Sequence, residues 1–110
     1  MRHINADELK TLLQQKKNLA LIDVLPETDF KKGHIPGSKN LPVSRGDFET
    51  KIQKEFGNKA QPVVVYCASK TCPAAPTAAQ KLEKLGYQNV YDFDGGMEEW
   101  KQKGNPIEAR

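Results

Sequence analysis

The feature that most constrains the fold is the run Pro62-Val63-Val64-Val65-Tyr66, which ends directly at a cysteine. An unbroken run of β-branched apolar residues is typical of a strand that is covered on both faces, and not of one that borders water. Residues 19–24 form a second run of this apolar kind. Strands that are buried on both faces occur mostly in parallel sheets with helices on each side. The chain is therefore predicted to be an α/β protein.

The segments between these runs carry helix signals. Asn5 and Glu8 have the spacing of a capping box and predict a helix start. Pro73 suits the first turn of another helix, which is expected to reach about Leu85 and to end at Gly86. Further helices are expected over residues 27–32, 47–56 and 97–103, and further extended segments over residues 39–42 and 89–93. Because strands and helices alternate, we predict a mostly parallel central sheet flanked by helices.

The size and charge of the chain limit its organisation and its partners. With 110 residues and no internal repeat or linker, residues 1–110 are predicted to form a single domain. The net charge of +3 comes from scattered lysines with acids between them, so we expect no nucleic-acid partner. No apolar run approaches the ~20 residues of a membrane helix. Residues 1–7 lack the apolar core of a secretory signal, so a cytoplasmic location and no membrane partner are expected.

The chain has two cysteines, Cys67 and Cys72. In a reducing cytoplasm, a structural disulfide between them is not expected. A zinc site needs more ligands than these two thiols, and the histidines, His3 and His34, lie far away in the sequence. We therefore expect no metal and no organic cofactor, and the question becomes whether either thiol is reactive.

Cys67 follows the best-defined strand and precedes a helix start. In open α/β sheets, ligands bind beyond the carboxyl ends of the strands. The amide groups and dipole of a helix N-terminus stabilise a thiolate, and can lower a cysteine pKa from about 8.5 to ~3.5–7.5. Lys70 adds a positive charge that can reach an incoming anion. The alternative is that Cys67 is a small buried apolar residue at a strand end, and these observations leave both interpretations open.

Several segments resemble the signatures of the rhodanese-like family, in the right order along nearly the whole chain. They are Ile22–Val24, Asp29–Pro42, Val63–Cys67, Leu85–Tyr91, Gly95-Gly96 with Trp100, and Gly104–Pro106. The resemblance implies a rhodanese-like three-layer sandwich with a five-stranded, mostly parallel sheet flanked by helices. It also implies that Cys67 is a catalytic nucleophile that takes up sulfane sulfur as a persulfide. The loop that would hold the substrate comprises Ala68, Ser69, Lys70, Thr71 and Cys72.

The loop departs from the family pattern at positions that bear on the sulfur donor. Rhodanese loops commonly read Cys-Arg-x-Gly-x-Arg, and Ala68, Lys70 and Cys72 stand at the Arg, Gly and second Arg positions. Leu25 also stands where the family usually has arginine. Guanidinium groups bind oxyanions such as thiosulfate through paired hydrogen bonds, whereas a lysine is a point charge. The sequence therefore favours a sulfurtransferase without specifying thiosulfate as its donor.

Cys72 has two competing interpretations. It is either a packing residue at the start of the helix or a resolving thiol that attacks a Cys67 persulfide or sulfenate. The resolving role requires the two Cα atoms to lie within about 7 Å.

The enzyme hypothesis predicts a small sulfur-containing anion or persulfide as donor, and a thiol or cyanide as acceptor, the thiol belonging to a small molecule or a protein. An alternative is a sulfur carrier or redox-regulatory module without turnover that switches through a Cys67–Cys72 disulfide. A phosphatase of the rhodanese fold is disfavoured, because the loop of that class is one residue longer and ends in an anion-binding arginine.

Four other positions attract structural predictions. Asp23, at a strand end, is expected to pair with a loop amide or a lysine. His34 is expected to be a hydrogen-bonding turn residue, and Trp100 a core anchor for the last helix. Gly95 and Gly96 are expected to let the backbone turn near the site.

Overall fold

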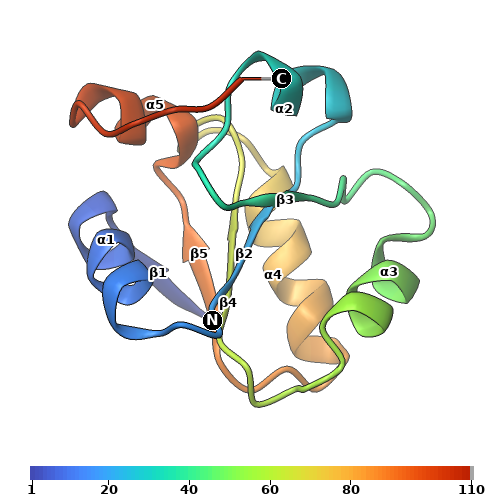
Figure 1. Cartoon of the computed structure of the whole chain (residues 1–110). Coiled ribbons are helices and arrows are strands. Elements are labelled where there is room, and N and C mark those ends of the chain that lie inside the picture. The colour runs from blue at the N-terminus through green and yellow to red at the C-terminus, as the bar shows by residue number, and fades with distance from the viewer. Residues whose placement is uncertain (110) are drawn as a thin grey trace.

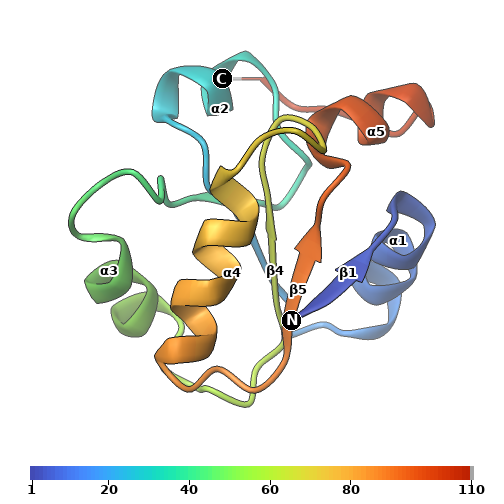
Figure 2. The same cartoon turned by 180° about the vertical axis from the view of Figure 1, so that it is seen from behind.

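The computed structural model describes residues 1–109. In that part of the chain, a five-stranded sheet lies between two layers of helices, as Figures 1 and 2 show from opposite sides. The strands are β1 (Arg2–Ile4), β2 (Ala20–Asp23), β3 (Lys39–Asn40), β4 (Val63–Tyr66) and β5 (Val90–Phe93). The helices are α1 (Ala6–Gln15), α2 (Glu27–Lys32), α3 (Phe48–Glu55), α4 (Ala74–Lys84) and α5 (Gly96–Gln102).

The sheet has the strand order β1-β5-β4-β2-β3, and every pair of neighbouring strands is parallel. The predicted α/β fold with a five-stranded sheet is therefore confirmed. Strand β4 lies at the centre, between β2 and β5, and both of its faces are covered. Its β-branched residues are fully buried, as the apolar run predicted.

The two faces of the sheet are covered by different helices. On one face, Val63 and Val65 of β4 pack with Ile52 of α3 and Leu82 of α4. On the other face, Val64 and Tyr66 pack with residues of α1 and α5, such as Leu9 and Trp100. Each face therefore buries alternate residues of the same strand, as the two-residue period of a strand requires. Within residues 1–109, no helix combines the length and apolar character needed to cross a membrane.

The predicted elements agree with the structure except at the N-terminus. The capping box is present, with Asn5 Oδ1 accepting from the Glu8 amide and Glu8 Oε1 accepting from the Asn5 amide. Strand β1 was not predicted from the residue pattern. Only Ile4 of its three residues is buried, so the segment has no apolar run, and its parallel pairing with β5 defines it.

Tyr66 connects the central strand to the turn that follows α2. Its hydroxyl accepts a hydrogen bond from the Ile35 amide at 3.1 Å and lies 2.9 Å from Ser38 Oγ. The side chain is fully buried, and this burial raises the pKa of the phenol well above its ordinary value. The neutral hydroxyl therefore satisfies a buried amide that has no other hydrogen-bond acceptor among residues 1–109.

Replacing Tyr66 with phenylalanine removes that acceptor and keeps the ring. We expect Tyr66→Phe to lose about 1–3 kcal/mol of unfolding free energy, because the Ile35 amide is left buried without a partner. Urea denaturation followed by fluorescence or circular dichroism measures the loss. Tyr91→Phe, at a half-buried tyrosine of β5, is the matched control, and a loss of equal size there would contradict the prediction.

Candidate active site

Cys67 directly follows β4 at the carboxyl end of the sheet. Its side chain is 1% exposed and packs in the core between the sheet and α3 and α4. The residue after it begins an exposed loop, Ala68–Pro73, that leads into α4. The sulfur of Cys67 therefore lies at the boundary between the buried end of the central strand and the loop at the edge of the molecule.

The first turn of α5 holds the start of this loop. The Met97 amide donates to the Cys67 carbonyl at 3.0 Å, and the Glu98 amide donates to the Ala68 carbonyl at 2.9 Å. In a trans peptide, the carbonyl and the following N–H point in opposite directions. With these carbonyls directed toward α5, the amides of Ala68 and Ser69 point away from it.

These amides and the next two have no internal partner. The N–H groups of residues 68–71 make no backbone or side-chain hydrogen bond within residues 1–109. The Cys72 amide differs, because it donates to the Ser69 carbonyl at 3.1 Å and closes a turn. Four of the five predicted loop amides are thus free to bind an anion, and the fifth stabilises the loop instead.

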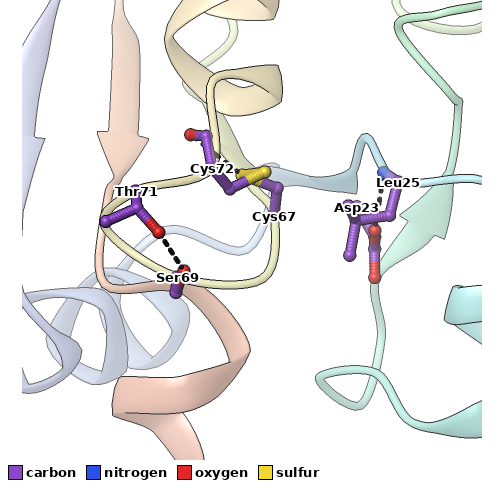
Figure 3. Close-up of a disulfide and its surroundings, with 6 residues drawn as sticks. All are labelled: Asp23, Leu25, Cys67, Ser69, Thr71 and Cys72. Atoms are coloured by element: carbon purple, nitrogen blue, oxygen red, sulfur yellow. Dashed lines mark hydrogen bonds between the residues drawn. A yellow bond between two sulfur atoms is a disulfide. The ribbon is translucent and has the colours of Figure 1, made fainter.

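The turn brings the two cysteines together, and they form a disulfide with their Cα atoms 6.5 Å apart (Figure 3). The expectation that no disulfide forms was wrong for this structure. It rested on the redox compartment alone, whereas the turn at Ser69 folds Cys72 back onto Cys67. The distance condition for a resolving thiol is met. Cys72 is half-buried and also packs against the core, so the two interpretations of Cys72 are compatible.

Polar groups at the loop come mainly from Ser69, Lys70 and Thr71. The Ser69 and Thr71 hydroxyls form a hydrogen bond (Figure 3), and their oxygens lie 3.2 Å apart. Lys70 is exposed at the tip of the loop. Residues 1–109 bring together no group of three or more His, Cys, Asp or Glu side chains that could bind a metal ion.

Asp23 ends β2 beside the site, in register with Tyr66 of β4. Its side chain is fully buried, and Oδ1 accepts from the Leu25 amide at 3.0 Å (Figure 3). The expected pairing with a loop amide is therefore confirmed. Burial raises the pKa of the carboxyl to about 6, and the hydrogen bond from Leu25 offsets part of this rise. Leu25 packs against the core, so this strand end presents an apolar side chain at the arginine position of the family pattern.

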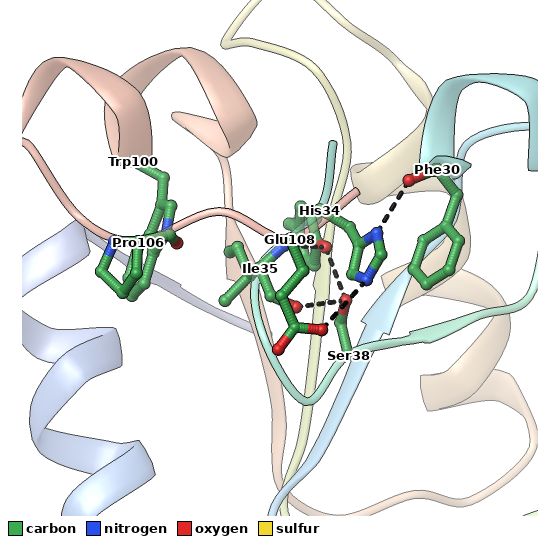
Figure 4. A network of polar contacts seen from close by, with 8 residues as sticks. Phe30, His34, Ile35, Ser38, Trp100, Pro106 and Glu108 are labelled. Atoms are coloured by element: carbon green, nitrogen blue, oxygen red, sulfur yellow. Dashed lines mark hydrogen bonds and ion pairs between the residues drawn. The ribbon is translucent and has the colours of Figure 1, made fainter. Parts of the chain in front are cut away.

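His34 and Trp100 hold the C-terminal segment and belong to a separate network (Figure 4). The His34 ring stacks on Phe30 with centroids 3.8 Å apart, and its Nδ1 lies 2.8 Å from the Phe30 carbonyl. The backbones of His34 and Glu108 form an antiparallel bridge. Trp100 is buried, and its indole N–H donates to the Pro106 carbonyl at 2.7 Å. Both predicted structural roles are confirmed.

Gly96 is the residue of the site whose importance the sequence indicated least clearly. Its φ is +58°, and an added Cβ would lie 2.3 Å from the Cys67 carbonyl oxygen. Glycine is therefore required both for the backbone conformation and for the close approach of α5 to the loop. The predicted backbone turn near the site is confirmed at Gly96, and its contact with the Cys67 carbonyl was not foreseen.

Gly96→Ala is expected to destabilise the protein more than a glycine substitution that strains the backbone alone. Gly104 is the matched control, because its φ is +74° and an added Cβ would meet nothing within 4 Å. We expect Gly104→Ala to cost about 1–2 kcal/mol of unfolding free energy, and Gly96→Ala to cost at least about 1 kcal/mol more. Urea denaturation compares them, and equal losses would contradict a tight contact between Gly96 and the loop.

The raised pKa of Asp23 predicts a dependence of stability on pH. A carboxyl whose pKa is raised from 3.8 to about 6 keeps its proton up to a higher pH in the folded state than in the unfolded state. Its stabilising contribution is therefore complete below about pH 4 and is lost as the pH rises to about 6.

Asn does not titrate, so the stability of Asp23→Asn does not change with pH through this position. Relative to the wild type, the variant should gain about 2–3 kcal/mol of unfolding free energy between pH 4 and pH 7. Urea denaturation of both proteins at several pH values in this range measures the gain. A difference between the two proteins that stays constant with pH would contradict the raised pKa.

The chain is similar to known proteins in sequence and in fold. The family model of the rhodanese-like domain matches residues 5–103. The thiosulfate sulfurtransferase GlpE of Vibrio cholerae is 31% identical over 107 residues, which cover 97% of this chain and 94% of that protein. A crystal structure of a thiosulfate sulfurtransferase from Pseudomonas aeruginosa superposes with a TM-score of 0.87 at 30% identity, over 99% of this chain and 20% of that one.

The relatives differ in how much of their length this chain spans. The HTH-type transcriptional regulator Rv0324 of Mycobacterium tuberculosis is 31% identical over 90 residues, which cover 82% of this chain but only 38% of the regulator. The matching sulfurtransferases support the expected class of enzyme, a rhodanese-type sulfurtransferase. With the family model matched over nearly its whole length, the chain belongs to the rhodanese-like domain family.

Proposed function

We propose that this protein is a sulfurtransferase that moves sulfane sulfur to an acceptor through a persulfide on Cys67. The observation that carries the proposal is the position of Cys67 at the end of the central strand, directly before four amides that lack internal partners. Such amides stabilise negative charge close to the sulfur. A thiolate, a persulfide and an anionic donor all carry that charge.

In the first half of the reaction, the reduced Cys67 thiolate attacks the outer sulfur of the donor. With thiosulfate, a new S–S bond forms on Cys67, and sulfite leaves with the electron pair of the broken S–S bond. With a persulfide donor, the leaving group is a thiolate. The free amides of residues 68–71 would stabilise the charge on the resulting persulfide.

In the second half, an acceptor takes the outer sulfur. A thiolate of a small molecule or protein, or cyanide, attacks that sulfur, and the Cys67 thiolate is regenerated as the leaving group. This is nucleophilic covalent catalysis, in which one transfer is divided into two displacements at sulfur. The exposed loop Ala68–Thr71 is the side from which both substrates would approach.

The side chains of the loop bear on the choice of donor. Its one cationic side chain is that of Lys70, while Ala68 and Leu25 provide no charge. A lysine attracts an anion without the paired hydrogen bonds by which a guanidinium recognises an oxyanion. We therefore propose that low-molecular-weight or protein persulfides serve as donors alongside thiosulfate, the donor named for the relative from Vibrio cholerae.

A redox-regulatory module without turnover is the second candidate, and the Cys67–Cys72 disulfide favours it. That role would use the bond as a reversible switch under mild oxidation. It differs from the enzyme in one measurable respect, because a switch forms the disulfide without accepting sulfur from a donor.

Sulfur uptake by the reduced protein tests the proposal. Incubation with thiosulfate, or separately with glutathione persulfide, should add one sulfur atom to the Cys72→Ser variant and none to Cys67→Ser, as measured by intact mass and peptide mapping. In steady-state transfer to cyanide, Cys67→Ser should be at least about a thousandfold slower than wild type, because it lacks the nucleophile.

Comparison of the two donors at equal concentration then measures donor preference. Absence of sulfur uptake at Cys67 from both donors, in a variant that is folded by circular dichroism, would contradict the enzyme. Disulfide formation under mild oxidant without any turnover would instead support the redox module.

A further inference from the structure

Cys72 contacts Sγ of Cys67, the atom to which the proposed reaction attaches a second sulfur atom. We propose that the chain also reduces sulfane sulfur, with the Cys72 thiol attacking Sγ of the Cys67 persulfide to release hydrosulfide and leave the Cys67–Cys72 disulfide. The inference rests on the proposed function, because Cys67 must first accept a sulfur atom. It adds a second activity in which the sulfur is released as hydrosulfide instead of being passed on.

The geometry of the loop selects which sulfur is attacked. A persulfide has an inner sulfur, which is Sγ of Cys67, and an outer one. In the structure, Sγ of Cys72 is bonded to that inner sulfur, and the Cα separation of 6.5 Å lies within the range of protein disulfides. The loop as folded therefore allows attack at the inner sulfur without movement of the backbone.

The surroundings of Cys72 keep it in this position. Its amide donates to the Ser69 carbonyl, and Pro73 follows at the start of α4. Its side chain is half-buried against the same core as Cys67, and Sγ of Cys67 lies 3.5 Å from the Cys72 carbonyl oxygen. A thiol held in this way competes well with dissolved acceptors, because its reaction is intramolecular. The position usually taken by an arginine in the family pattern here carries a second nucleophile.

The step balances in atoms and electrons. The Cys72 thiolate forms a bond to Sγ of Cys67, the bond between the inner and outer sulfurs breaks, and the outer sulfur leaves as hydrosulfide with the electron pair and the persulfide proton. The two cysteine sulfurs are oxidised, and the sulfane sulfur is reduced. Starting from thiosulfate, the products are sulfite, hydrosulfide and the disulfide form of the protein.

Renewed turnover requires a thiol reductant, and a dithiol suits this role best because its second exchange is intramolecular. A dithiol reduces the Cys67–Cys72 disulfide by two successive thiol–disulfide exchanges and becomes a disulfide itself. A monothiol acceptor, in contrast, would take the outer sulfur directly and leave Cys67 as a thiolate. The partner of this second activity is therefore a small dithiol or a dithiol protein, and the substrates are sulfane-sulfur donors.

A single-turnover experiment without added reductant tests the inference. The wild type, Cys72→Ser and Cys67→Ser are reduced, freed of reductant and mixed with thiosulfate or glutathione persulfide. Hydrosulfide is trapped with a bimane reagent, and the protein is analysed by intact mass and peptide mapping. Omission of the reductant matters, because a dithiol would also release hydrosulfide from the persulfide of Cys72→Ser.

We expect the wild type to release one equivalent of hydrosulfide and to finish as the intramolecular disulfide. Cys72→Ser should keep the added sulfur on Cys67 and release hydrosulfide at least about tenfold more slowly, because the intramolecular thiol is gone. Cys67→Ser should neither take up sulfur from the donor nor release hydrosulfide. With donor in excess, the first-order rate constant of release in the wild type should be independent of protein concentration.

Different failures remain distinguishable. If wild-type Cys67 holds a stable persulfide and releases no hydrosulfide, or if the sulfur is found on Cys72, the reductase activity is refuted while sulfur transfer stands. A rate constant of release, per protein molecule, that rises with protein concentration would refute the intramolecular step. If no sulfur enters the wild type or Cys72→Ser from either donor, the proposed sulfurtransferase fails, and the reductase with it.

Discussion

Two hydrogen bonds from the first turn of α5 to the carbonyls of Cys67 and Ala68 are the constraint on which the site depends. They direct both carbonyls to one side, so the following amides face the other way. The close approach of the helix requires a residue without a side chain at Gly96, since a Cβ there would collide with the Cys67 carbonyl. A C-terminal helix therefore sets the conformation of a loop that lies about thirty residues earlier in the chain.

The same loop combines two properties that are usually considered apart. Its free amides supply partial positive charge that does not depend on any side chain, and such charge suits an anionic sulfur species. The turn from Ser69 to Cys72 brings a second sulfur to the first. The backbone thus provides the electrostatic environment, and the identity of residue 72 determines whether a persulfide waits for an external acceptor or is resolved within the protein.

Much of the fold followed from local patterns. The capping box at Asn5 and Glu8 was recognisable because its two hydrogen bonds lie within four residues. The apolar run 62–66 predicted a central strand because burial on both faces leaves no room for alternating polar residues. Strand β1 was not predicted because it has only three residues, most of them exposed, and so carries no such pattern. Backbone pairing with β5 holds it in the sheet.

The sequence by itself determined the α/β class, the family resemblance and the place of Cys67 at the end of a buried strand. These features can be read from the periodicity and type of residues that are neighbours in the sequence. The tertiary structure alone decided that four loop amides lack partners, that Gly96 contacts the Cys67 carbonyl, and that Cys72 lies against Cys67. The physical reason is that these contacts depend on how α5 and the loop pack together, and residues separated by a whole strand and helix meet only after the sheet has formed.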